Sequence, residues 1–73
     1  MEIKDIMLEV NKGVYLHDSD IYIEYVSHDG NTFDMQVIIL NLDKFLGLKN
    51  IAVIINRTLS KYGFKLNKLS LKK

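Results

Sequence analysis

Two runs of alternating apolar and polar residues on either side of residue 30 constrain the fold of this chain most strongly. Residues 21–26 read Ile-Tyr-Ile-Glu-Tyr-Val, and residues 33–40 read Phe-Asp-Met-Gln-Val-Ile-Ile-Leu. Alternation with a period of two is typical of strands that bury one face. Asp29 and Gly30 between the runs are typical turn residues, so the segment predicts a β-hairpin.

The register of this hairpin depends on the length of its loop. A two-residue turn at 29–30 would pair Val26 with Phe33 and would mix a carboxylate into the apolar face. A three-residue loop at 28–30, with the glycine in the left-handed bulge position, gives one continuous apolar face. We therefore expect the second register, in which the pairs are Tyr25 with Phe33, Ile23 with Met35, and Ile21 with Val37.

The opposite face of the hairpin is acidic and polar in this register. Its expected residues are Asp20, Tyr22, Glu24, Val26, Asp34 and Gln36. Glu24 then lies directly across from Asp34, and like charges in opposed positions destabilise a sheet. Such a pair indicates a surface that meets cations on a partner.

A first helix is predicted near the amino terminus, because apolar residues at positions 3, 6, 7 and 10 share one helical stripe. It runs from about Glu2 to Asn11 and stops at Gly13. Residues 14–17 are expected to form a short strand or the start of one long bent strand. Residues 18–20, Asp-Ser-Asp, have turn chemistry.

A second helix is predicted from a cap at Asn50, because residues 51, 54, 55, 59 and 62 recur at helical spacing. The β-branched run within 51–55 also favours a strand, but the helical period continues as far as Tyr62. Gly63 followed by Phe64 is typical of a left-handed carboxyl-terminal cap with an apolar contact.

Two further segments are less regular. Asn41 or Asp43 can cap a short helix that carries Leu42, Phe45 and Leu46 and ends at Gly47. In the tail, 64–73, the apolar alternation changes phase, which fits a strand with a bulge near residues 67 and 68. A short strand followed by a frayed end fits equally well.

Together these elements predict one α+β domain over residues 1–73, with a small antiparallel sheet of two to four strands packed against two helices on one face. A chain of this length buries about 60% of the surface that its unfolded form exposes, which leaves room for one core. The expected core is Ile3, Ile6, Met7, Val10, Ile21, Ile23, Tyr25, Phe33, Met35, Val37, Ile39, Ile51, Ile54, Ile55 and Leu59.

Charge is divided along the sequence, although the net charge is only +1. Residues 1–40 contain eight acidic residues against two lysines, a net charge of −6. Residues 41–73 contain one aspartate against eight lysines and arginines, a net charge of +7. The two halves can neutralise each other on folding, or they can form separate surfaces for partners.

The chain contains no cysteine, which excludes disulfides, a thiol nucleophile and cysteine-ligated metals. Its longest nearly unbroken apolar run, 51–55, is too short to cross a bilayer, and no membrane partner is expected. We therefore expect a cytoplasmic protein without a cofactor. Asn56-Arg-Thr58 matches the glycosylation pattern, which has meaning only in a secreted protein.

Catalytic and metal-binding patterns are weak. His17, Asp18 and Asp20 could supply divalent-metal ligands, but neighbouring residues on a turn rarely converge, and we expect an ordinary polar turn. Glu24 and Asp34 could act as an acid–base pair only if desolvated. Neither a nucleophile elbow nor a glycine-rich phosphate loop occurs, so we predict no catalytic site and no enzyme.

The predicted function is non-enzymatic binding to a protein partner through the acidic sheet face, in a small regulatory or inhibitory protein of the kind that phages or mobile elements encode. The contact residues would be Asp20, Tyr22, Glu24, Asp34 and Gln36. One alternative is nucleic-acid binding by a lysine-rich end with interleaved aromatic residues Tyr62 and Phe64, where phosphate contacts would come from Lys61, Lys65, Lys68, Lys72 and Lys73. Another alternative is a homodimer or larger homo-oligomer that gains burial at a sheet edge or helix face.

Overall fold

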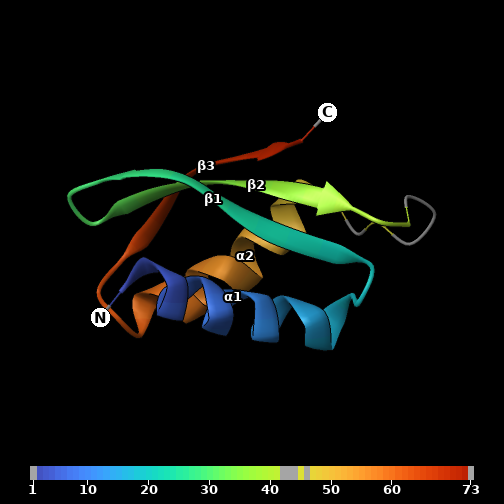
Figure 1. The fold of residues 1–73 in the computed structure, drawn as a ribbon, viewed down its shortest axis with the longest axis horizontal. Coiled ribbons are helices and arrows are strands. Elements are labelled where there is room, and N and C mark those ends of the chain that lie inside the picture. The colour runs from blue at the N-terminus through green and yellow to red at the C-terminus, as the bar shows by residue number, and fades with distance from the viewer. Residues whose placement is uncertain (1, 42–44, 46, 73) are drawn as a thin grey trace.

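The computed structural model describes residues 2–41, 45 and 47–72. Its elements, in chain order, are α1 (Ile3–His17), β1 (Ile21–Asp29), β2 (Thr32–Ile39), α2 (Leu48–Ser60) and β3 (Lys65–Leu71). The strands form one sheet in the order β1-β2-β3, and both helices lie against the same face of it (Figure 1). The predicted α+β fold, with a small sheet packed against two helices, is confirmed.

The sheet is mixed, whereas the sequence predicted antiparallel strands only. β1 pairs with β2 in antiparallel orientation, and β3 pairs with β2 in parallel orientation. The reason is the position of α2 between the two parallel strands, because a helix of this length carries the chain back to the end of the sheet where β2 began. β2 is therefore the central strand, and β1 and β3 are the edges.

The hairpin register differs by two residues from the predicted one. Tyr25 pairs with Met35 instead of Phe33, and Ile23 pairs with Val37. Residues 30 and 31 form a two-residue turn between the paired Asp29 and Thr32, and an extra residue at Val26 makes a β-bulge. The bulge restores the side-chain alternation, so the apolar face is the predicted one although each predicted partner is wrong.

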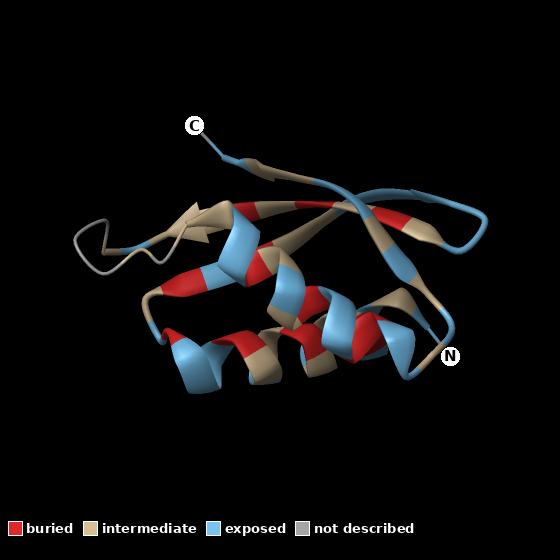
Figure 2. Ribbon diagram, turned by 180° about the vertical axis from the view of Figure 1, so that it is seen from behind, coloured by how far each residue is buried: buried red, intermediate tan, exposed pale blue. Residues whose placement is uncertain are grey.

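The core lies between the helices and the sheet, and buried residues, red in Figure 2, occur in both of these layers. It consists of Ile6, Val10, Val14, Ile21, Ile23, Phe33, Met35, Val37, Ile51, Ile55 and Leu59. All of these except Val14 were predicted. The other predicted core residues, Ile3, Met7, Tyr25, Ile39 and Ile54, are partly buried and pack against this cluster.

Helix α1 continues through Gly13 to His17, so the predicted stop and the predicted strand at 14–17 are both wrong. A Cβ atom on Gly13 would lie 3.3 Å from the Thr58 Oγ1 atom and 3.9 Å from the Ile54 Cγ2 atom. The glycine therefore marks a close approach between α1 and α2. Val14 extends the buried stripe of α1 by one more turn beyond Val10.

The predicted left-handed cap at the end of α2 is confirmed. Gly63 has a φ of 80°, its N–H donates to Ser60 O at 3.2 Å, and Phe64 N–H donates to Leu59 O at 3.0 Å. These two bonds are those of a Schellman motif. Phe64 then packs against the core, with its ring centroid 5.0 Å from that of Phe33.

Gly63→Ala is expected to lower the free energy of unfolding by about 1 kcal/mol, because a Cβ atom is strained in the left-handed region. Among the described residues other than its two chain neighbours, none has a heavy atom within 4 Å of the position of this Cβ, so the loss comes from the backbone and not from a clash. Urea unfolding followed by circular dichroism measures it. Gly63→Asn is the control, since asparagine tolerates this conformation, and an equal loss in both variants would contradict the explanation.

The tail forms a bulged strand, which is one of the two alternatives that the sequence left open. Leu66 pairs with Phe33 and Lys68 pairs with Asp34, so Asn67 is the extra residue of a bulge in β3. The short helix predicted over 42–46 lies outside the described residues, apart from Phe45, which packs against the core.

Asparagine side chains from the helices cap both outer edges of the sheet. On β1, Asn11 Oδ1 accepts the Ile23 N–H at 2.8 Å, and Asn11 Nδ2 donates to Ile23 O at 3.0 Å. On β3, Asn56 Oδ1 accepts the Leu66 N–H at 2.8 Å. Each amide takes the place of a neighbouring strand, which protects that edge position from pairing with another chain.

Candidate functional site

The structure brings four of the five predicted protein-binding residues to the outer face of the sheet. Tyr22 and Glu24 of β1, and Asp34 and Gln36 of β2, alternate with the buried residues of their strands and so point away from the helices. Asp20 precedes β1 and belongs to the turn after α1. Glu24 faces Gln36, and Asp34 faces Ser27, so the predicted Glu24–Asp34 opposition is wrong.

Residues of β3, and Lys72 directly after it, compensate the charge of this outer face. Lys72 Nζ lies 3.4 Å from Glu24 Oε1, and Gln36 Nε2 donates to the same oxygen. Asp34 accepts hydrogen bonds from Asn67 Nδ2 at 2.9 Å and from Ser27 Oγ at 3.3 Å, and Lys68 is its neighbour in the β3 register. Two carboxylates and two lysines therefore share the face, which is close to neutral.

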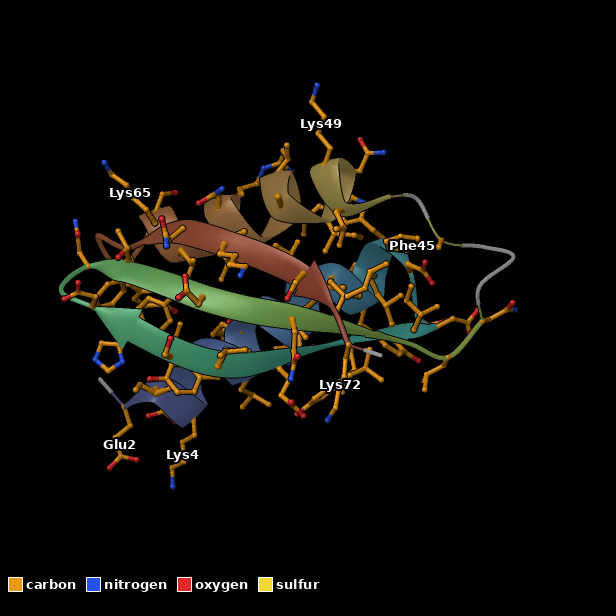
Figure 3. All side chains as sticks on the ribbon, turned by 90° about the horizontal axis from the view of Figure 1, so that it is seen from above. Glu2, Lys4, Phe45, Lys49, Lys65 and Lys72 are labelled. Atoms are coloured by element: carbon orange, nitrogen blue, oxygen red, sulfur yellow. The ribbon has the colours of Figure 1, made fainter. Side chains whose placement is uncertain are left out.

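Within the described part of the chain, four cations on α2, at its C-cap and at the start of β3 have no such carboxylate neighbours. Lys49, Arg57, Lys61 and Lys65 are exposed, and none of them forms an ion pair with a described residue. These four residues are called the basic surface below. Figure 3 shows Lys49 and Lys65 projecting on the α2 and β3 side of the molecule, away from Glu2 and Lys4 at the amino-terminal end of α1.

The local sequence explains why these cations share one side of α2. Ile51, Ile55 and Leu59 recur every four residues and turn one side of the helix into the core. Lys49, Arg57 and Lys61 are spaced by eight and four residues, which places them together on the opposite, exposed side. No aspartate or glutamate occurs after residue 43, so the helix offers them no carboxylate of its own.

The predicted lysine-rich end is divided between two environments. Lys61 and Lys65 belong to the basic surface, whereas Lys68 and Lys72 lie beside the carboxylates of the sheet face. Lys73 lies outside the described residues. Sequence reasoning missed Lys49 and Arg57, and their helical spacing from Lys61 was the signal that could have found them.

The opposite side of the molecule is more apolar. Leu8, Tyr15 and Leu16 of α1 and Tyr22 of β1 are exposed. A shallow hollow of about 440 Å³ lies between α1 and β1 and is lined by residues that include Met7, Leu8, Tyr22 and Tyr25. Tyr15 and Leu16 were assigned to a strand from the sequence, so this second apolar side of α1 was not foreseen.

The residues considered as metal ligands form an ordinary turn with one unusual atom. Asp18 Oδ1 accepts the Asp20 N–H at 2.9 Å, which closes the predicted turn. Asp18 is only 7% exposed, and its Oδ2 atom is buried without a hydrogen bond from the described part of the chain. No group of three or more histidine, aspartate or glutamate side chains among the described residues could hold a metal ion.

Comparisons with family models, with curated proteins and with solved structures found no match for this chain. Within the described residues, neither helix has the length and hydropathy needed to span a membrane.

Proposed function

We propose that this protein is a non-enzymatic module that binds nucleic acid through the basic surface. The observation that carries the proposal is the set of four exposed cations, Lys49, Arg57, Lys61 and Lys65, without a carboxylate partner among the described residues. Phosphates bound there would release condensed counterions, which is the main source of affinity in such contacts.

The contrast with the acidic residues supports this choice of surface. Glu2 pairs with Lys4, Glu9 pairs with Lys12, and Glu24 pairs with Lys72. Three of the nine acidic residues thus have a lysine partner within the molecule, whereas no cation of the basic surface has a carboxylate partner among the described residues. Protein binding through the sheet face and homodimerisation stay predictions, and the near-neutral charge of that face gives a basic partner little to attract.

The separation of acidic and basic residues toward opposite edges of the sheet also favours contact with a polyanion. α1 packs beside β1, and α2 packs beside β3, at opposite edges of the sheet. Acidic residues concentrate in the first pair of elements and cations in the second. A polyanion at the basic surface therefore lies toward the opposite edge of the sheet from Glu2, Asp5 and Glu9. We propose that the protein acts in the cytoplasm, where a chain without cysteine needs no oxidising environment.

Lys49→Gln combined with Arg57→Gln is expected to weaken binding to nucleic acid by roughly 50-fold at 0.1 M salt. The binding constant varies with the salt concentration raised to a power of about −0.9 for each phosphate contact. The loss of two contacts therefore lowers the binding constant at 0.1 M salt by roughly this factor. The measurement is fluorescence anisotropy with a labelled 20-base-pair DNA duplex.

Lys4→Gln combined with Lys12→Gln is the matched control. These two lysines also lie eight residues apart on a helix, and their substitution removes the same number of positive charges, from α1 instead of α2. It should change the affinity by no more than about threefold, since both lysines are remote from the basic surface and already paired. Equal losses in both variants would show that net charge, and not this surface, governs binding. No binding by the unchanged protein at low salt would remove the proposal.

A further inference from the structure

The shape of the basic surface bears on which nucleic acid it fits. Lys49 and Arg57 lie on the exposed side of α2, and Lys61 is the C-cap residue of the same helix. At 1.5 Å per residue, successive cations of this row lie about 12 Å and 6 Å apart along the helix axis. The first of these separations is close to the width of a B-form major groove, about 12 Å. Lys49 and Arg57, at this separation, can reach phosphates on the two sides of a groove.

The same surface lacks the means to hold unstacked bases. Sequence-tolerant proteins of the single-strand-binding class stack bases on exposed aromatic side chains. Here the Phe64 ring packs edge-to-face on Phe33 at 5.0 Å and against the core, and Tyr62 is partly buried. The large apolar side chains that α2 and β3 do expose are Val53 and Leu71, and neither is aromatic.

The exposed tyrosines lie elsewhere. Tyr15 is on α1 and Tyr22 is on β1, at the other edge of the sheet from β3. A single strand held by the basic surface would therefore have its phosphates bound and its bases unsupported. A duplex keeps its bases stacked on one another and presents about one charge per 1.7 Å, so it loses nothing by the absence of aromatic partners.

We propose that the nucleic acid is a double helix, held through its phosphates with α2 lying across a groove and without readout of the bases. This inference rests on the proposed function and specifies its ligand. Three of the four cations are lysines, which contact phosphates as flexible point charges and carry little sequence information. DNA and RNA duplexes share this phosphate chemistry, and the two are separated by experiment.

Four labelled probes test the inference by fluorescence anisotropy between 50 and 200 mM salt: two 20-base-pair DNA duplexes of unrelated sequence, an RNA duplex of the same length, and a 20-nucleotide oligothymidine. At least one kind of duplex should bind about tenfold or more tighter than the oligothymidine, and the two DNA sequences should agree within about threefold. The slope of log affinity against log salt for the DNA duplex should be about −3.6, from four contacts at 0.9 each. Lys65→Gln should reduce the steepness of this slope by about 0.9.

The outcomes separate this inference from the proposed function. Equal or tighter binding of the oligothymidine would overturn the duplex inference and leave nucleic-acid binding in place. A difference of more than about thirtyfold between the two DNA sequences would overturn binding through phosphates alone. Failure of all four probes to bind at 50 mM salt would overturn the proposed function itself. The duplex that binds more tightly, DNA or RNA, identifies which of the two is the ligand. Circular dichroism of Lys65→Gln confirms that this variant is folded.

Discussion

Phe33→Ala is expected to remove about 3–5 kcal/mol from the free energy of unfolding, the largest effect that we expect of a single substitution. Phe33 is 1% exposed and lies on the central strand β2, and its ring contacts those of Tyr25 and Phe64 at 6.0 and 5.0 Å. A domain of this size is stable by roughly 4–11 kcal/mol in total. The loss is therefore a large share of its stability, and urea unfolding monitored by circular dichroism measures it.

His28→Ala is the control for this substitution. The His28 ring also stacks on Phe33, at 5.5 Å and an interplanar angle of 25°, but it is exposed. Its removal should lower the free energy of unfolding by less than about 1 kcal/mol, since it leaves no cavity. A loss as large as that of Phe33→Ala would show that contacts among the rings, and not burial, determine the stability of this cluster.

Asn11→Ala is expected to lower the free energy of unfolding by about 2–4 kcal/mol. The substitution removes the hydrogen bonds to both backbone groups of Ile23 and to Met7 O, the last at 3.1 Å. It leaves the amide and carbonyl of Ile23 without partners beneath α1, and an unsatisfied group of this kind costs about 1–3 kcal/mol. The same urea titration reports the change.

Asn67→Ala serves as the comparison, because Asn67 also donates a hydrogen bond, to Asp34 Oδ1, but from an exposed position. Its loss should be below about 1 kcal/mol, since water can replace the lost partner. Equal effects of the two substitutions would contradict the assigned role of Asn11. Light scattering of Asn11→Ala should also rise with concentration as the edge of β1 is uncovered.

The sequence predicted the faces of the hairpin better than its pairings. Alternation with period two determines which side chains of Ile21–Asp29 and Thr32–Ile39 turn inward, and these were predicted correctly. The partners depend also on turn length and on bulges. A two-residue turn with an extra residue at Val26 gives the same inward face as a three-residue loop without one, so the pattern could not distinguish them.

Gly13 shows why local signals were insufficient for α1. A glycine after an amphipathic run marks either a helix end or a close helix contact, and only the packing partner decides between them. That partner is Thr58, forty-five residues later in the chain, and it cannot be inferred from residues near Gly13. Gly63 was predicted correctly because its cap is formed by bonds within the same turn, to Ser60 and Leu59.

The candidate site also has one part that local sequence signals indicate and another part that depends on contacts between distant residues. Helical spacing within α2 brings Lys49, Arg57 and Lys61 together, so this part was present in the sequence as a local pattern. The compensation of Glu24 by Lys72 joins residues that are forty-eight positions apart, and it arises because β3 lies parallel to β2. The direction of β3 follows from the β2-α2-β3 connection, which the expectation of an antiparallel sheet excluded.

Placing β1 with α1 at one edge of the sheet and β3 with α2 at the other gives the molecule a permanent electric dipole moment across its width. A net charge of +1 determines the force that a uniform electric field exerts on the protein, but it does not describe the torque that the same field exerts on the dipole. Near a highly charged polymer the molecule would rotate before it touches, and a larger fraction of collisions would occur with the productive side foremost. The rate at which the protein encounters such a polymer should therefore exceed the rate expected for a net charge of +1. This excess should vanish once added salt shortens the Debye length below the thickness of the fold, which is 19 Å in its smallest dimension.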